Sequence, residues 1–334
     1  MNPYSPLFVS IEQPHLTQSD KDMLSHPFVG GVVIFSKNFT SKEQIQDLIA
    51  QIKALKSPAL LICVDHEGGR VQRFKQGFTV LPPMHKLGEL YDQNSDVALA
   101  CANACGYIIG KELGEVGVDF SFTPVLDLDY GQSSVIGDRS FHADPEIVTR
   151  LAGALIDGLA QAGMQAIGKH FPGHGFVVKD SHLELPQDPR DLSEIAQKDL
   201  LPFEELGSKL AGMMTAHVLY QKVAPEIASF SAFWLKQVLR EQLAYQGLIF
   251  SDDLLMKATD KTGDISARAK ASLDAGCDVL LLCNSDKEVL NLLNDKTITQ
   301  RQGCVDYSAL YYQPKAQLKI YTDAVTLLMN QGLI

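Results

Sequence analysis

Eight short apolar runs recur along the chain, and segments with helical periodicity lie between them. Each run is nearly continuous in hydrophobic residues, as expected of strands that are buried on both faces. The runs are Leu7–Ile11, Gly31–Phe35, Leu60–Val64, Phe120–Val125, Ala166–His170, Met213–His217, Leu248–Ser251 and Val279–Cys283. We therefore expect eight parallel strands.

The segments between the runs repeat their apolar positions with the period of an α-helix. They predict helices over Ser41–Leu55, Asp96–Val116, Pro145–Ala162, Leu192–Leu210, Ala232–Ala244 and Ile265–Ala275. Strand and helix alternate without a linker, repeat or low-complexity segment, which favours one (β/α)8 barrel domain spanning residues 1–334. A doubly wound open sheet is the alternative. Residues from about 306 to 334 should pack as a closing helix with a turn near Pro314.

Composition narrows the classes of partner. Hydrophobic residues make up 46% of the 334 residues, enough for a sizeable core, and the net charge of −11 argues against nucleic acid and anionic membranes. No signal peptide or run of transmembrane length is visible, and the six cysteines lack CxxC spacing. We expect a cytoplasmic protein, monomeric because no exposed heptad stands out, with Cys63, Cys277 and Cys283 as buried thiols.

A barrel places catalytic groups at the carboxyl ends of its strands and in the loops that follow. Polar residues end several of the predicted strands: Asp65, Lys169-His170, His217, Asp252-Asp253 and, just past the eighth run, Asn284. The two longest strand-to-helix connections are about Asp127–His142 and Phe171–Asp191, and loops of this length are usually functional or mobile. The site should form where these segments meet.

The segment from Lys169 to His182 concentrates titratable groups most strongly. It reads Lys-His-Phe-Pro-Gly-His-Gly-Phe-Val-Val-Lys-Asp-Ser-His, with three imidazoles, and follows a predicted strand. Asp180 and His182 are two residues apart, so on extended backbone the carboxylate could orient the imidazole as an acid/base dyad. A surface loop pair is the alternative interpretation of these two residues.

Two further clusters carry candidate chemistry. Of Asp252 and Asp253, one should face the barrel mouth while the other caps the next helix, and the pattern does not decide which; both could be structural caps. The segment from Asp65 to Arg73 contains two glycines that allow close backbone approach, and Asp65 is a candidate ligand binder. The pattern leaves Arg70 undecided, and Arg139 alone would be a solvated charge.

Three other patterns have a weaker claim. Gly163–Lys169 fits the spacing of a phosphate-binding loop, but His170 replaces its Ser/Thr and the glycines enter a strand. His170, His174, His182 and Asp180 lack the helical spacing of zinc sites, so we expect no metal. Trp234, the sole tryptophan, is better explained by packing than by sugar stacking.

The motifs together strongly resemble glycoside hydrolase family 3. These are Lys-His-Phe-Pro-Gly-His-Gly with Asp-Ser-His, the Asp-x-Glu-Gly-Gly-x-Val-Gln-Arg segment from Asp65, and Ser-Asp-Asp-Leu from Ser251. The resemblance covers essentially the whole chain. Within the family, the chain most resembles the single-domain bacterial β-N-acetylglucosaminidases of cell-wall recycling. It implies a barrel without a cofactor that hydrolyses with retention through a covalent glycosyl-enzyme.

The resemblance also assigns roles to individual residues. It implies Asp252 as nucleophile and His182 as acid/base assisted by Asp180. Sugar-binding positions fall on Asp65, Arg73, Arg139, Lys169 and His170. The implied substrate is N-acetylglucosamine β-linked to anhydro-N-acetylmuramic acid, with or without its peptide. A broader β-glycosidase, a non-catalytic sugar sensor and a metal-dependent hydrolase remain alternatives. The sequence leaves open the use of Asp253 and the mobility of the loop from His174 to Asp191.

Overall fold

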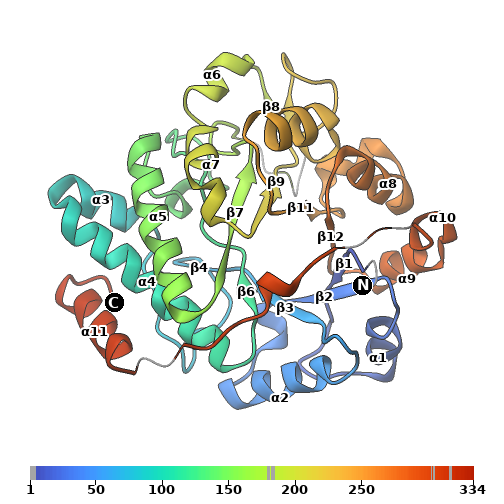
Figure 1. The fold of residues 1–334 in the computed structure, drawn as a ribbon, viewed down its shortest axis with the longest axis horizontal. Coiled ribbons are helices and arrows are strands. Elements are labelled where there is room, and N and C mark those ends of the chain that lie inside the picture. The colour runs from blue at the N-terminus through green and yellow to red at the C-terminus, as the bar shows by residue number, and fades with distance from the viewer. Residues whose placement is uncertain (1–4, 179–180, 182–184, 302, 304, 316–317) are drawn as a thin grey trace.

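The barrel closes through the pairing of the first strand with both the second and the last. The structure is a computed structural model, and it describes residues 5–178, 181, 185–301, 303, 305–315 and 318–334. Within these ranges, eight parallel strands form a closed barrel in the order β1-β12-β11-β9-β7-β6-β3-β2 (Figure 1). Their bounds are β1 Leu7–Val9, β2 Val29–Ile34, β3 Leu61–Val64, β6 Phe120–Ser121, β7 Gln165–Phe171, β9 Gly212–Thr215, β11 Leu248–Asp253 and β12 Val279–Leu282.

Each barrel strand overlaps one of the predicted apolar runs. The predicted (β/α)8 barrel is therefore confirmed. The open-sheet alternative is wrong, because β1 pairs with both β2 and β12 and leaves no edge. Short strands outside the barrel form two small sheets: β4 (His66–Gly68) with β5 (Val71–Gln72), and β8 (Gln187–Asp188) with β10 (Leu219–Tyr220).

Helices surround the barrel, as Figure 1 shows. Their bounds are α1 Gln18–Leu24, α2 Lys42–Lys53, α3 His85–Gln93, α4 Ser95–Glu115, α5 Pro145–Ala162, α6 Leu192–Ala196, α7 Leu201–Leu206, the π-helix Phe233–Gln242, α8 Ile265–Ala275, α9 Asp286–Asn294, α10 Lys296–Thr299 and α11 Leu318–Asn330. Local signals fix α5: Asp144 caps its first amides, and Gly163 ends it at a φ of 94°. No helix among the described residues is both long and apolar enough to cross a membrane.

The prediction of one helix over 192–210 is wrong. That segment is divided into α6, α7 and a 3-10 turn over Gly207–Lys209. Pro202 lies in the first turn of α7, where its missing N–H costs nothing. In a continuous helix it would remove a hydrogen bond and its ring would clash with the preceding turn.

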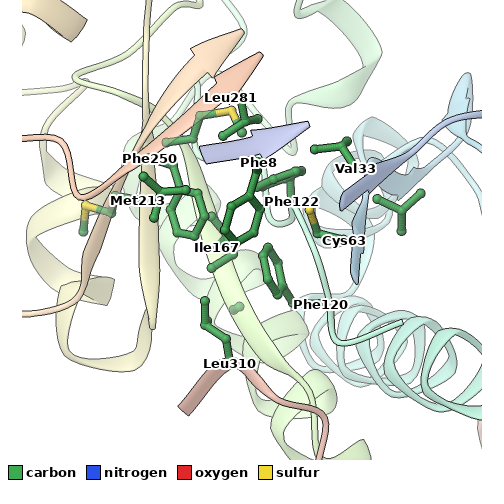
Figure 2. Packing of buried hydrophobic residues seen from close by; sticks show 14 of the residues in the cluster. Phe8, Val33, Cys63, Phe120, Phe122, Ile167, Met213, Phe250, Leu281 and Leu310 are labelled. Atoms are coloured by element: carbon green, nitrogen blue, oxygen red, sulfur yellow. The ribbon is translucent and has the colours of Figure 1, made fainter. Parts of the chain in front are cut away.

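The barrel interior is filled by aromatic rings. Phe8, Phe120, Phe122 and Phe250 are almost fully buried and meet near the barrel axis (Figure 2). The rings of Phe8 and Phe250 lie edge-to-face with centroids 6.0 Å apart, and those of Phe120 and Phe122 are 5.5 Å apart. Such geometry favours the aromatic quadrupoles. The barrel is thus a packed core and not a pore.

The C-terminal segment first runs across the amino end of the barrel and only then becomes helical. Tyr307 packs its ring 5.8 Å from that of Phe8 and donates to the carbonyl of Ser5, and Leu310 is buried. The helix α11 begins only at Leu318 and packs against α4. The expected closing helix is therefore shorter than predicted. Cys63, Cys277 and Cys283 are buried and free, as predicted.

Candidate active site

One cavity of about 360 Å³ opens at the carboxyl ends of the barrel strands. Its floor includes Met214 of β9 and Leu281 of β12. It brings together six of the eight side chains to which the resemblance assigned a role: Asp65, Arg73, Arg139, Lys169, His170 and Asp252. Asp180 and His182 lie outside the described residues. Ser181, which stands between them in the sequence, is buried and lines the same cavity.

Lys169, near the end of β7, is held between two acids. Its Nζ donates to Asp65 Oδ1 at 2.7 Å and lies 2.6 Å from Glu67 Oε1, and its side chain is only 2% exposed. Arg73 approaches the other oxygen of Asp65 at 3.6 Å. Burial alone would raise the pKa of Asp65, but the charges of Lys169 and Arg73 outweigh it and hold the pKa below its usual value.

Glu67 is the most enclosed acid of the cavity. Arg139 binds it with both arms, Nε to Oε2 and Nη2 to Oε1, each at 2.8 Å. Burial would raise the pKa of Glu67, but Arg139 and Lys169 keep it well below its usual range. A bidentate guanidinium fixes both distance and plane. Arg139 is therefore not the solvated charge that the sequence alone suggested.

His170 is oriented by Asp127, which follows β6. His170 Nδ1 lies 2.6 Å from Asp127 Oδ2, and the backbone N–H of His174 donates to Asp127 Oδ1 at 2.6 Å. Burial opposes ionisation of Asp127, but the neighbouring His170 outweighs it and lowers the pKa. Because an ionised carboxylate only accepts, Nδ1 of His170 carries its proton here.

His174 adds an imidazole at the same wall of the cavity. Burial, followed by the charge of His170, lowers the pKa of His174 to about 4, so its ring is neutral near pH 7. Within the described part of the chain, neither ring nitrogen has a hydrogen-bond partner. A neutral imidazole offers one donor and one acceptor, which suits hydroxyl or amide groups.

The two adjacent acids at the end of β11 differ in their contacts. Asp253 Oδ1 accepts from the backbone N–H groups of Leu255 and Cys283, at 3.1 and 3.2 Å, and so ties β11 to the end of β12. The N–H of Asp253 donates to Asp252 Oδ1 at 2.8 Å. Both carboxylates line the cavity. Asp253 is not the helix cap that the pattern predicted for one of the two acids, because the next helical segment, a 3-10 helix over Lys257–Thr262, has Met256 at its N-cap position and no side-chain cap.

Other expected strand-end residues have supporting places. His217 is fully buried, and its Nε2 lies 3.0 Å from the carbonyl oxygen of Asp253, behind the cavity wall. Asn284 lines the rim, where its side chain accepts from Lys37. Trp234 is buried and packs its ring against Tyr220, which agrees with the packing interpretation.

Arg70 connects two loops through hydrogen bonds. Its guanidinium donates to Asp138 at 2.8 Å and to the backbone carbonyls of residues 134–136. It therefore joins the loop after β3 to the loop after β6. The sequence left its role undecided, because its partners lie more than sixty positions away.

Two central residues were not singled out by the sequence: Glu67 and Asp127. Glu67 stands two positions after Asp65, a spacing that can direct both side chains to one side. Asp127 stands two positions after the end of the apolar run Phe120–Val125, close to a strand end as Asp65 is. Both signals were present but weak. In the described residues, no three His, Cys, Asp or Glu side chains are grouped so as to hold a metal.

Known proteins are similar to this chain over nearly its whole length, including the residues that line the cavity. The model of the glycosyl hydrolase family 3 N-terminal domain matches residues 8–305. A β-hexosaminidase of Nitrosospira multiformis is 52% identical over 289 residues, covering 86% of this chain and 83% of that protein. A β-hexosaminidase of Methylobacillus flagellatus is 46% identical over 322 residues, covering 95% and 92%. The crystal structure of NagZ from Neisseria gonorrhoeae with N-trifluoroacetyl-D-glucosamine has a TM-score of 0.86 at 42% identity, covering 99% of this chain and 95% of that one.

Proposed function

Since the chain belongs to glycosyl hydrolase family 3, we propose that it is a retaining exo-β-N-acetylglucosaminidase whose nucleophile is Asp252. It is a glycoside hydrolase of the β-hexosaminidase type. The observation that carries the proposal is the gathering of Asp252 with sugar-binding side chains in one cavity. The similar NagZ structure with an N-acylated glucosamine supports the choice of sugar.

In the first step, a carboxylate oxygen of Asp252 attacks the anomeric carbon of the sugar. The bond from that carbon to the leaving oxygen breaks, and His182 gives this oxygen its proton. The product is a glycosyl ester on Asp252. Asp180 orients the imidazole and stabilises its protonated form before transfer.

In the second step, water attacks the same carbon from the face that the leaving group vacated. The neutral His182 takes a proton from the water, and the bond to Asp252 breaks. Two inversions leave the β-configuration unchanged. The rigid end of β11, tied to β12 through Asp253, suits a nucleophile that must hold its position in both steps.

The remaining polar groups bind the sugar hydroxyls. Asp65 shows nearly a quarter of its side chain to the cavity, while Lys169 and Glu67 behind it are almost enclosed. A carboxylate bound to two cations on one side can accept hydrogen bonds from hydroxyl groups on the other. Arg73, Arg139 and His170 complete this set at the cavity wall.

The natural substrate that we propose is N-acetylglucosamine β-linked to anhydro-N-acetylmuramic acid in peptidoglycan turnover fragments, with or without the peptide. The whole chain acts as one catalytic domain, monomeric and in the cytoplasm. No cofactor enters this reaction. The cations Arg73, Arg139 and Lys169 are paired with Asp65 and Glu67 at the cavity wall.

The test is hydrolysis of 4-nitrophenyl N-acetyl-β-glucosaminide by wild type and by Asp252→Ala, with EDTA present throughout. We expect wild-type turnover, its loss in the variant, and a first product of β-configuration by NMR. Preference for the corresponding glucoside would favour a broader β-glycosidase. Binding without turnover would favour a sugar sensor, and inhibition by EDTA a metal-dependent hydrolase.

A further inference from the structure

Arg190 lies at the base of the long loop after β7, outside the cavity described above. Its Nε and Nη2 donate to the carboxylate of Asp188, at 3.1 and 2.7 Å. Its Nη1 donates to Asp199 Oδ2 at 2.7 Å and to the hydroxyl oxygen of Tyr130 at 2.8 Å. The guanidinium thus holds two buried carboxylates and one phenol at once.

The same guanidinium packs on two aromatic rings. Its Cζ lies 4.1 Å from the ring centroid of Phe176 and 5.1 Å from that of Tyr130. The two rings meet edge-to-face, with centroids 5.3 Å apart. Gln132 adds a hydrogen bond to the carbonyl of Phe176 at 2.6 Å. The loop thus has a first stem, which leaves β7 and contains Phe176, and a returning stem, which contains Asp188. The first stem is fixed through Phe176.

The returning stem is fixed through Asp188, which lies in β8 and pairs with β10. Arg190 consequently joins the two stems to each other and, through Tyr130, to the loop after β6. Between the stems, the carbonyl of Ser181 accepts from the N–H of Ala258 at 3.1 Å. Asp180 and His182 belong to this same stretch of sequence.

Such a cluster is expensive to bury. Arg190 is only 9% exposed, and removing one member of a buried ion pair leaves the charge of its partner buried without compensation. Burial would lower the pKa of Arg190, but its bonds to Asp188 and Asp199 outweigh this and raise it, so the charge persists. Apolar packing alone could close the base of a loop, whereas this arrangement also fixes the relative direction of its stems.

We infer that Arg190 is a positioning residue for the acid/base group, acting by fixing both ends of the loop that contains Asp180 and His182. This inference rests on the proposed function, because it assigns proton transfer to His182. It predicts that loss of Arg190 weakens proton donation to the leaving group more than it weakens attack by Asp252.

The experiment compares leaving groups of different acidity. For Arg190→Met, kcat/KM is measured on phenyl and 2,4-dinitrophenyl N-acetyl-β-glucosaminides, since kcat/KM reports the step that forms the glycosyl-enzyme. General acid catalysis is worth about 10²- to 10⁴-fold, so we expect about a 10- to 100-fold loss on the phenyl substrate and less than about threefold on the dinitrophenyl substrate. Arg190→Lys should recover part of the loss.

A second variant guards against misfolding. Phe176→Leu removes the ring under the guanidinium but leaves every charge paired, and it should show the same selective loss in weaker form. The matched control is Arg240→Met. Arg240 also binds a carboxylate, Asp278, at 2.7 Å and packs on the ring of Tyr245, but its partners lie at the amino ends of β11 and β12. It should lose stability without changing the ratio of the two substrates.

The outcomes separate the two proposals. If His182→Ala shows the leaving-group dependence and the folded Arg190 and Phe176 variants do not, the inference on Arg190 is overturned and the proposed function stands. If His182→Ala shows no such dependence, the assignment of the acid/base fails first. In the double variant of Arg190 and His182, the loss of Arg190 should have no further selective effect.

Discussion

Replacing Glu67 with Gln removes one negative charge from the centre of the buried network. Lys169 and Arg139 then keep their charges, with side chains only 2% and 12% exposed, but lose the negative charge that they share. At an effective dielectric of about 20, each attraction across about 4 Å is worth about 4 kcal/mol. The neutral amide avoids the desolvation penalty of the carboxylate, so the net loss of unfolding free energy should be about 3–5 kcal/mol.

The same substitution should change the pH dependence of stability. The pKa of Glu67 in the folded protein lies well below the ordinary value of 4.5, because Arg139 and Lys169 outweigh burial. Its stabilising contribution is therefore complete above pH 4.5 and is lost as the pH falls. Below that pH, the difference between wild type and Glu67→Gln should shrink by up to about 1.4 kcal/mol per pH unit.

The assay is reversible urea unfolding of both proteins at neutral pH and at two acidic pH values. Glu115→Gln is the matched control, since Glu115 also lies between two cations, Lys42 and Lys111, at 3.2 and 3.1 Å, but is 42% exposed. Its loss should be below about 1 kcal/mol. Equal losses in the two variants at neutral pH would refute the reasoning, as would a difference that grows on acidification.

Two further predictions concern the cavity wall. Asp127→Asn weakens the hydrogen bond that orients His170. Since a hydrogen bond to a charged group is worth about 1.5–3 kcal/mol, kcat/KM should fall about 10- to 100-fold. Steady-state kinetics at saturating and limiting substrate measure this, and an unchanged kcat/KM would contradict the orienting role of Asp127. Arg70→Met should cost less than about 1 kcal/mol of stability, because Arg70 is half exposed, but should raise KM by releasing the loop that contains Arg139. A thermal melt together with a KM measurement checks both parts, and a lower melting temperature with an unchanged KM would be the wrong pattern.

The elements of the fold were predictable because their signals are local. Continuous apolar runs place the barrel strands, and the helix over 145–162 was predicted with the bounds that it has, since Asp144 and Gly163 stand at its ends. The shorter helices α1, α3, α9 and α10 were missed, because four to nine residues give too few turns for a clear period. Pro202 was a local signal too, but the apolar periodicity around it was given more weight.

The sequence could predict which residues belong to the candidate site, but not which of them contact each other. Strand ends indicated Asp65, Lys169 and Asp252, and the structure brings all three to one cavity. The partners of Lys169 lie about a hundred positions away, so no window of sequence shows that the lysine is held between Asp65 and Glu67. The same holds for Arg190, whose partner Tyr130 belongs to a different loop.

The aromatic floor of the barrel has a consequence for the order of events in the proposed reaction. Phe8, Phe122 and Phe250 fill the axis of the barrel, so among the described residues no path leads through the barrel, and substrate and products use its carboxyl end. The leaving fragment occupies the face of the sugar from which water must attack. It therefore has to depart before the glycosyl-enzyme can be hydrolysed. An alcohol that diffuses into the emptied part of the cavity then competes with water for the glycosyl ester on Asp252. The relative access of water and alcohol decides between hydrolysis and transfer of the sugar to a new acceptor.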